Sequence, residues 1–223
     1  MKHIFFWAPV FGLFTGCSNT APGGQHNAEY YVRYLAPEAQ LRAEMTLYEM
    51  ARPSNTRQPV APPEGIRYGD VLMSAVRAPQ NTYRLERSGG YAPQHVFTWK
   101  DPENRLCTFA ANLPAMPAFS FGARVISRQR PSTFRWEGDP FEQGESLVFM
   151  WENAQENRTV PMEIIGAPGQ SSIDFPAAQL SKLTPGSWTL YLVRKKSVQA
   201  KINDTAVNGV LEYYTNIDTL EVQ

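Results

Sequence analysis

Short stretches in which apolar and polar residues alternate recur along the chain from residue 29 to its end, and turn-forming residues separate them. In SWTLYLV, for example, Trp188, Leu190 and Leu192 fall on one face of an extended chain, because successive side chains of a β-strand point to opposite faces. The 18 prolines and 15 glycines suit the many turns that such strands require. The pattern therefore predicts an all-β protein.

The length of 223 residues suits one large domain or two domains of ordinary size. The stretch LPAMPAFSFG, which begins at Leu113, has the composition of a junction between domains. Beyond it, short strand patterns recur with the rhythm of an immunoglobulin-like sandwich, which has about 100 residues. We therefore expect two consecutive β-sandwich (immunoglobulin-like) domains, the first at residues 28–120 and the second at residues 121–223.

The segment at residues 37–52 fits two structures. Pro37 can occupy the first position of a helix, and strong helix formers follow it. In period two, however, Leu41, Ala43 and Met45 share one face. The clean alternation and the neighbouring strands favour a strand, but the sequence leaves both structures open.

Three turn sequences predict hairpins. SGG at residues 88–90 can supply the positive φ of a hairpin turn, and Pro102 pre-sets φ in the DPEN turn at residues 101–104. These two turns would join three strands into a meander over residues 82–110. Asn208-Gly209 is the strongest two-residue hairpin signal of the chain and predicts a turn between KINDTAV and VLEYYT.

The first 16 residues have the features of a targeting signal. Lys2 supplies a positive charge, and the apolar run that ends at Phe14 is shorter than the roughly 20 residues that span a bilayer. Small residues precede Cys17, as at a cleavage site. A cleaved secretory signal and an uncleaved anchor are both compatible with this pattern.

The stretch LFTGC resembles the signal of bacterial lipoproteins, although Phe14 stands where that family usually has Leu, Val or Ile. The resemblance implies that residues 1–16 are removed and that Cys17 carries lipid (palmitate and related chains) on its thiol and its new amino group. Residues 17–27 would then be a lipidated, flexible tether. Because Ser18 rather than Asp follows, the resemblance implies a lipid-anchored protein of the bacterial cell envelope, at the outer membrane.

A second resemblance lies near the C-terminus. SSIDFPAAQLSKLTPGSWTLYLVR looks like the late strands of immunoglobulin and fibronectin-III modules, and Leu183, Pro185 and Gly186 match their Leu-x-Pro-Gly element. Those modules usually place Tyr where this chain has Thr189. The resemblance supports a sandwich for the second domain, and the whole chain is similar to two-module lipoproteins of Bacteroidetes-like bacteria, many of which have no assigned function.

Few residues offer catalytic chemistry. Once the leader is removed, His26 and His95 are the remaining histidines, and the sequence contains no His-Glu-x-x-His, Gly-x-Ser-x-Gly or phosphate-binding loop. We expect His26 to be a solvated tether residue and His95 to be a half-buried or exposed strand residue. The sequence therefore predicts a protein that is not an enzyme and has no cofactor.

Cys107 is the one thiol that remains if Cys17 is acylated, so the mature chain has no pair for an intramolecular disulfide. It alternates with Thr108 in RLCTF, on the face of Phe109. We expect a buried core cysteine. An intermolecular disulfide and a nucleophilic role are the alternatives.

The richest acidic cluster is EGDPFEQGE at residues 137–145, which contains Glu137, Asp139, Glu142 and Glu145. Calcium takes six to eight oxygen ligands, so these carboxylates are a weak candidate calcium site, although the spacing of a regular calcium loop is missing. A solvated loop between strands is the favoured interpretation. A pair of carboxylates for glycoside hydrolysis is a further, remote alternative.

Aromatic side chains are the other resource of the sequence. A few exposed ones would form a platform on which sugar rings stack, although most are needed in the core. The candidates are Tyr30, Tyr31, Tyr34, Tyr91, Trp99, Trp136, Trp151 and Trp188.

Charge excludes one class of partner. Lys plus Arg and Asp plus Glu each number 21, and no basic cluster is visible, so we expect no nucleic-acid partner. The sequence favours a non-catalytic, membrane-anchored protein-interaction or structural module with a protein partner in the envelope. A carbohydrate-binding lipoprotein is the alternative.

Overall fold

The computed structural model describes residues 25–51, 56–76 and 81–223. The strands are β1 (Gln25–Leu35), β2 (Gln40–Ala51), β3 (Thr56–Val60), β4 (Arg67–Tyr68), β5 (Val71–Leu72), β6 (Ser74–Val76), β7 (Thr82–Ser88), β8 (Gln94–Lys100), β9 (Leu106–Asn112), β10 (Phe119–Phe121), β11 (Val125–Ile126), β12 (Ser132–Trp136), β13 (Glu145–Asn153), β14 (Arg158–Ile165), β15 (Ser172–Phe175), β16 (Gly186–Ile202), β17 (Thr205–Tyr214) and β18 (Asp218–Val222). Two short helices accompany them, the 3₁₀ helix η1 (Ala36–Glu38) and α1 (Ala177–Leu180). The prediction of an all-β protein is confirmed.

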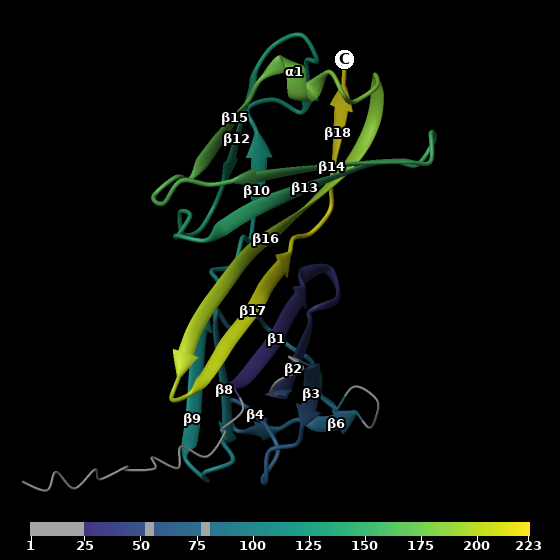
Figure 1. The fold of residues 1–223 in the computed structure, drawn as a ribbon. Helices are drawn as coiled ribbons and strands as arrows, with labels where there is room; N and C mark the ends of the chain where they lie inside the picture. Colours follow the sequence, from purple (N-terminus) through teal and green to yellow (C-terminus); the bar gives the residue numbers. More distant parts are fainter. Residues whose placement is uncertain (1–24, 52–55, 77–80) are drawn as a thin grey trace, which may run out of the picture.

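Over the described residues, the strands form three sheets (Figure 1). The large sheet has the order β11-β18-β16-β17-β1-β2-β7-β6, with β13 and β14 joined at β16 and β3 joined at β2. The lower sheet has the order β5-β4-β8-β9, and the upper sheet has the order β10-β12-β15. In the view of Figure 1 these two smaller sheets lie at opposite ends of the molecule.

The lower sheet packs on the inner face of β1 and β2, to which every second side chain of these strands points. The ring centroid of Tyr30 lies 5.5 Å from that of Phe97 and 4.9 Å from that of Phe109. All three side chains are buried, at 4% exposure or less. Aromatic rings at such separations supply much of the apolar contact between two facing sheets, so β1 and β8–β9 form a β-sandwich.

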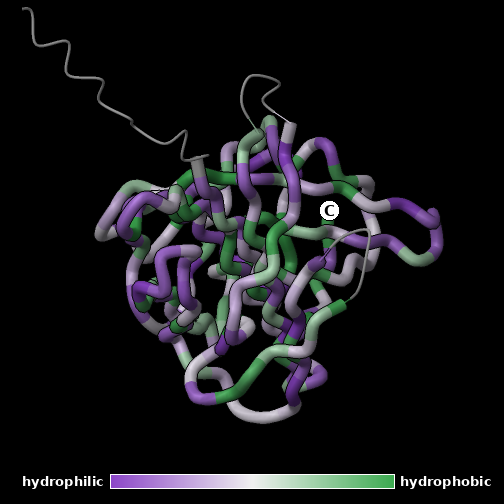
Figure 2. Tube along the Cα trace, turned by 60° about the horizontal axis from the view of Figure 1, so that its bottom comes forward, coloured by the Kyte–Doolittle hydropathy of each residue, from purple (hydrophilic) through white to green (hydrophobic). Residues whose placement is uncertain are grey.

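The upper sheet packs in the same way on β13. Phe149 contacts Phe134 and Phe175 in edge-to-face pairs, with ring centroids 4.8 Å and 4.7 Å apart. None of these three side chains is exposed. In Figure 2 hydrophobic segments run through the body of the molecule, and the loop that protrudes at the right is mostly hydrophilic.

One strand runs through both sandwiches. The first half of β16 pairs with β18 and β13, and its second half pairs with β17. Strand β17 in turn pairs in parallel with β1, from His26 opposite Thr205 to Leu35 opposite Tyr214. Hydrogen bonding therefore crosses the boundary predicted at residue 120, and the two sandwiches share the large sheet.

The expected tether at residues 17–27 ends earlier than predicted. Strand β1 begins at Gln25, because β2 and β17 satisfy its backbone hydrogen bonds on both sides. His26 is thus a half-buried strand residue and not a solvated tether residue. The rest of the expected tether, like residues 1–16, lies outside the described residues.

The ambiguous segment at residues 37–52 is a strand over most of its length. After the short helix η1, β2 buries Leu41, Ala43, Met45 and Leu47 against the core, as period two predicts. The segment forms a strand in spite of its helix propensity, because its antiparallel partners β1 and β7 supply backbone hydrogen bonds on both sides.

The meander over residues 82–110 forms only in part. The turn at Asp101 does join β8 to β9 as a hairpin, and the Asn104 N–H donates to the Asp101 carbonyl oxygen. The hairpin predicted at residues 88–90 is wrong, because β7 pairs with β2 and β6 in the large sheet while β8 belongs to the lower sheet. The SGG sequence carries the chain from one sheet to the other.

The hairpin predicted at Asn208-Gly209 is also wrong. Strand β17 runs straight through both residues, and the turn lies five residues earlier, where Asn203 has a φ of +50°. Gly209 is needed for a different reason. A Cβ at this position would lie 2.3 Å from Cδ1 of Tyr30, so only glycine lets that ring pack across β17.

Candidate functional site

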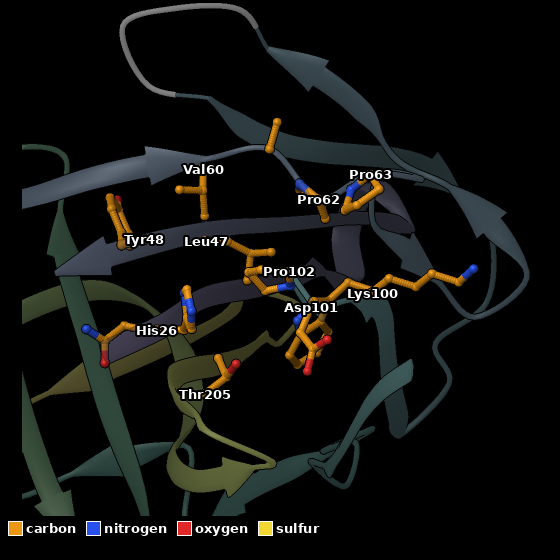
Figure 3. A pocket seen from close by; sticks show the side chains of 13 residues that line it. His26, Leu47, Tyr48, Val60, Pro62, Pro63, Lys100, Asp101, Pro102 and Thr205 are labelled. Atoms are coloured by element: carbon orange, nitrogen blue, oxygen red, sulfur yellow. The ribbon is translucent and has the colours of Figure 1, made fainter. Parts of the chain in front are cut away.

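A proline-lined slot opens between the edge of the large sheet and the β8–β9 turn (Figure 3). It has a volume of about 140 Å³. Its walls come from β1, β2, the end of β3 with the segment after it, the end of β8 with the turn after it, and the start of β17. The residues that line it are His26, Asn27, Leu47, Tyr48, Val60, Ala61, Pro62, Pro63, Trp99, Lys100, Asp101, Pro102 and Thr205.

Local structure fixes the walls of the slot. Asp101 holds the β8–β9 turn, because its carboxylate accepts hydrogen bonds from the backbone N–H and the Nε of Arg105, at 2.8 and 2.7 Å. Burial pushes the pKa of Asp101 upward, but these hydrogen bonds outweigh it and hold the pKa below its usual value. Pro102 then projects into the slot from a rigid turn (Figure 3).

The chemistry of the slot is mainly apolar. Leu47, Val60 and Trp99 line it together with three prolines, and the Asp101 carboxylate is occupied by Arg105. His26 and Thr205 lie side by side as strand partners at one edge. This lining can hold an apolar group and provides no paired acid and base.

His95 lies elsewhere, deep in the lower sandwich. Its side chain is 1% exposed, so the expectation of a half-buried or exposed residue is wrong. The strand alternation of β8 points it inward together with Phe97 and Trp99. The Tyr68 hydroxyl lies 2.5 Å from Nδ1 and the Tyr91 hydroxyl lies 3.3 Å from Nε2.

The hydrogen bonds of these tyrosines define the tautomer of His95. Tyr91 donates its hydroxyl proton to the Leu113 carbonyl oxygen, at 2.7 Å. Nε2 must therefore donate to Tyr91, and Nδ1 accepts from Tyr68. Burial lowers the pKa of His95 to about 4, with a smaller contribution from the charge of Arg87. His95 is thus a neutral, fully hydrogen-bonded core residue.

The acidic stretch at residues 137–145 folds around a buried cation. Glu145 is buried, and its Oε2 accepts hydrogen bonds from Nε and Nη2 of Arg194, at 3.0 and 2.6 Å. Arg194 also donates to the carbonyl oxygens of Asp139 and Pro140. The stretch is therefore held by Arg194, and its deepest carboxylate already has a counter-ion.

The four carboxylates of the weak candidate calcium site do not meet at one point. Glu137 and Asp139 are exposed, and Glu142 pairs with Lys196. Among the residues that the structure describes, no group of three or more His, Cys, Asp or Glu side chains is placed to hold a metal ion.

The aromatic residues proposed for a sugar platform lie mostly in the core. Trp99, Trp136, Trp151 and Trp188 are between 0% and 7% exposed. Tyr30 and Tyr34 are also buried, while Tyr31 and Tyr91 are half-buried. The four tryptophans therefore contribute to packing between sheets and do not form an exposed surface.

Of the two cysteines, only Cys107 lies among the described residues. Cys107 is a buried free cysteine of β9, as its alternation predicts, and burial raises the pKa of its thiol. Cys17, the expected lipidation site, lies outside the described residues. No described helix combines the length and the apolar character needed to cross a membrane.

The sheets and the slot together define the class of the protein, an all-β protein in which two sandwiches share one large sheet. No protein-family model matches the sequence, and no curated protein matches it. Among solved structures, the crystal structure of murine CEACAM1b is similar to the chain, with a TM-score of 0.28 and 6% sequence identity over 89% of this chain and 100% of that one. A similarity of this size carries no argument about function.

Sequence reasoning did not find the slot. Its walls come from segments that are far apart in the sequence, and strand pairing alone brings them together. One local signal was present, since Pro62, Pro63 and Pro102 stand in turn sequences as rigid apolar residues.

Proposed function

We propose that the protein is a non-catalytic lipoprotein of a bacterial cell envelope, anchored through lipid on Cys17, that binds a protein partner through the proline-lined slot. The observation that carries the binding role is the slot itself, an apolar cavity with an open mouth beside exposed residues such as Pro63. The lipoprotein-like LFTGC sequence supports the anchor.

The size of the slot favours a protein side chain as its occupant. Pockets for small-molecule ligands typically have about 300–1,000 Å³, whereas this slot has about 140 Å³. A single apolar side chain fits such a volume. In many protein interfaces a few residues contribute most of the affinity, and these residues are often side chains that insert into a pocket of the partner.

The walls of the slot support binding because they are already ordered. Pro62, Pro63 and Pro102 have a fixed φ, and the Asp101–Arg105 contacts hold the turn that carries Pro102. A preformed site loses little conformational entropy when a partner binds, so more of the contact energy remains as affinity.

The binding role is tested by photo-crosslinking in cells that express the full chain. A photoreactive residue at Pro63 should give an adduct with an envelope protein. Val60→Arg, which fills the slot, should abolish the adduct, and the matched variant Val71→Arg, on an exposed valine of β5, should leave it unchanged. An adduct that persists in Val60→Arg, or no adduct at all, would exclude this role of the slot.

The anchor is tested separately by metabolic labelling with palmitate. The wild-type chain should incorporate label and sediment with membranes, and Cys17→Ala should do neither. Labelling that is equal in the two chains, or absent from both, would exclude lipidation at Cys17 and would leave the crosslinking result unaffected.

A further inference from the structure

A second cavity lies on the outer face of the large sheet, at the other end of β1 and β2 from the slot. It has a volume of about 170 Å³ and is lined by Arg33 and Leu35 of β1, Gln40 and Arg42 of β2, and Glu86 of β7. The strand register explains this grouping, because Arg33 is opposite Arg42 and Arg42 is opposite Glu86. Side chains at these positions share one face of the sheet.

Arg33 is a cation without a counter-ion in the part of the chain that the structure describes. Its Nε atom is buried and has no hydrogen-bond partner there. Glu212 is opposite Arg33 on β17, but its Oε2 accepts the hydroxyl groups of Tyr31 and Tyr214, at 2.5 and 2.9 Å. The Arg33 guanidinium carbon lies 5.9 Å from the centroid of the Tyr214 ring, a contact that orients the guanidinium without neutralising it.

Arg42 adds a second positive charge to the same cavity. Its Nε and Nη2 contact Oε1 of Glu44, at 2.8 and 2.6 Å, and Glu86 lies 3.5 Å from Nε. Like charges directly opposite each other on paired strands are destabilising. Glu44 and Glu86 offset this repulsion at Arg42, so Arg33 is the guanidinium of this pair that remains available to an anion.

We propose that this cavity binds a carboxylate group, with Arg33 as the principal donor and Gln40 and Arg42 beside it. A guanidinium offers two parallel N–H groups that match the two oxygens of a carboxylate. Gln40 adds amide N–H donors. Leu35 supplies an apolar wall for the carbon chain that carries the acid.

The charge of the cavity favours a singly charged ligand. Glu44 and Glu86 face the charges of Arg42 and Arg84, so the single positive charge of Arg33 is the one that remains to be neutralised. A doubly charged phosphate or sulfate would meet repulsion from Glu86. The carboxylate can belong to a small organic acid or to the C-terminus of a peptide, and this site is independent of the proline-lined slot.

The test follows the Arg33 Nε–H resonance of the purified full-length chain by NMR while acetate replaces chloride at constant ionic strength. We expect a saturable shift with a dissociation constant in the millimolar range. Arg33→Gln should weaken acetate binding about tenfold or more, because it removes a charge-assisted donor pair. In this variant the Nε–H resonance of Arg42 reports the binding. Arg135→Gln, on the exposed face of β12, is the matched control and should bind as the wild type does.

Thermal unfolding gives a second measurement that does not depend on assigned resonances. Acetate should raise the Tm of the wild-type chain and of Arg135→Gln, but not of Arg33→Gln, because a ligand that binds only the folded state stabilises it.

Competition with acetate identifies the source of the carboxylate. If a peptide with a free C-terminus competes and its amidated form does not, a peptide carboxylate is a ligand. Competition by small acids alone would identify a free acid. No saturable shift, equal binding of sulfate, or unchanged binding by Arg33→Gln would overturn the proposal.

Discussion

The carboxylate of Glu145 and the guanidinium of Arg194 form an ion pair in which Oε2 and Nη2 are 2.6 Å apart and neither side chain is exposed to solvent. Arg194 comes from β16, the strand common to both sandwiches, and Glu145 is the first residue of β13. Through its further hydrogen bonds to the carbonyl oxygens of Asp139 and Pro140, Arg194 connects the acidic loop to the shared sheet.

Removal of one partner of this pair should be costly. Glu145→Gln leaves the Arg194 charge buried without its counter-ion, and we expect a loss of about 3–5 kcal/mol in the free energy of unfolding, measured in urea by tryptophan fluorescence. Glu64→Gln, which removes the exposed partner of Lys100, is the control and should cost about 1 kcal/mol or less. A Glu145→Gln chain as stable as that control would contradict this role of the ion pair.

His95 should make the stability of the protein depend on pH. Burial holds its pKa at about 4 in the folded chain, whereas an unfolded histidine has a pKa of about 6.5. Between these pH values the unfolded chain binds a proton at this histidine and the folded chain does not. The stabilisation that the neutral His95 gives the folded state is therefore fully present above about pH 6.5 and is lost as pH falls toward 4. The expected loss is about 3 kcal/mol.

Unfolding in urea at a series of pH values measures this effect. His95→Phe removes the titrating group, so its free energy of unfolding should change less between pH 6.5 and 4 than that of the wild type, although carboxylates titrate in both chains. The same pH slope in the two chains would show that His95 is not the group responsible.

Local patterns predicted the strands but not their partners. The alternation in β16 correctly placed Trp188 and Leu190 on the same face, and the alternation in β9 correctly predicted a buried Cys107, because side-chain direction in a strand follows from local geometry. Pairing of β1 with β17 joins residues about 180 positions apart, and no local rule specifies such a partner. The burial of His95 and both cavities were missed for the same reason, since their neighbours come from distant strands.

The Leu-x-Pro-Gly element at Leu183 lies in a turn that a buried aromatic side chain holds. Leu183 is fully buried, and β16 begins at Gly186. Trp188 donates from Nε1 to the Thr184 carbonyl oxygen, at 2.9 Å. This buried aromatic side chain connects the start of β16 to the preceding turn.

Gly209 offers a direct test of the corrected hairpin. In β17 a methyl group at this position would lie 2.3 Å from Cδ1 and 2.4 Å from the backbone oxygen of Tyr30, so Gly209→Ala should destabilise the protein by about 1–3 kcal/mol through displacement of that ring and of the paired β1 backbone. Gly90→Ala is the matched control, since nothing lies within 4 Å of its Cβ position, and it should have little effect on the urea midpoint. If Gly209→Ala were neutral or stabilising, the close packing of Tyr30 on β17 would be disproved.

Cys107 should react only when the lower sandwich opens. Its side chain is fully buried, burial raises its pKa, and Asn203 donates from Nδ2 to Sγ at 3.4 Å. The thiolate is the reactive species, so a buried thiol of raised pKa is protected both by access and by protonation. We expect no modification of Cys107 by a maleimide in the native chain and complete modification in urea, read by mass spectrometry.

A variant links this protection to the contacts at the β16–β17 turn. Asn203→Ala removes the hydrogen bond to Sγ, while Asn208→Ala alters an exposed residue of β17 away from the thiol and serves as the control. Native-state labelling of Cys107 should become faster in Asn203→Ala and stay unchanged in Asn208→Ala, because local opening of the turn limits access to the sulfur. Labelling of the native wild type at the rate found in urea would mean that Cys107 is accessible without opening, which contradicts its burial in β9.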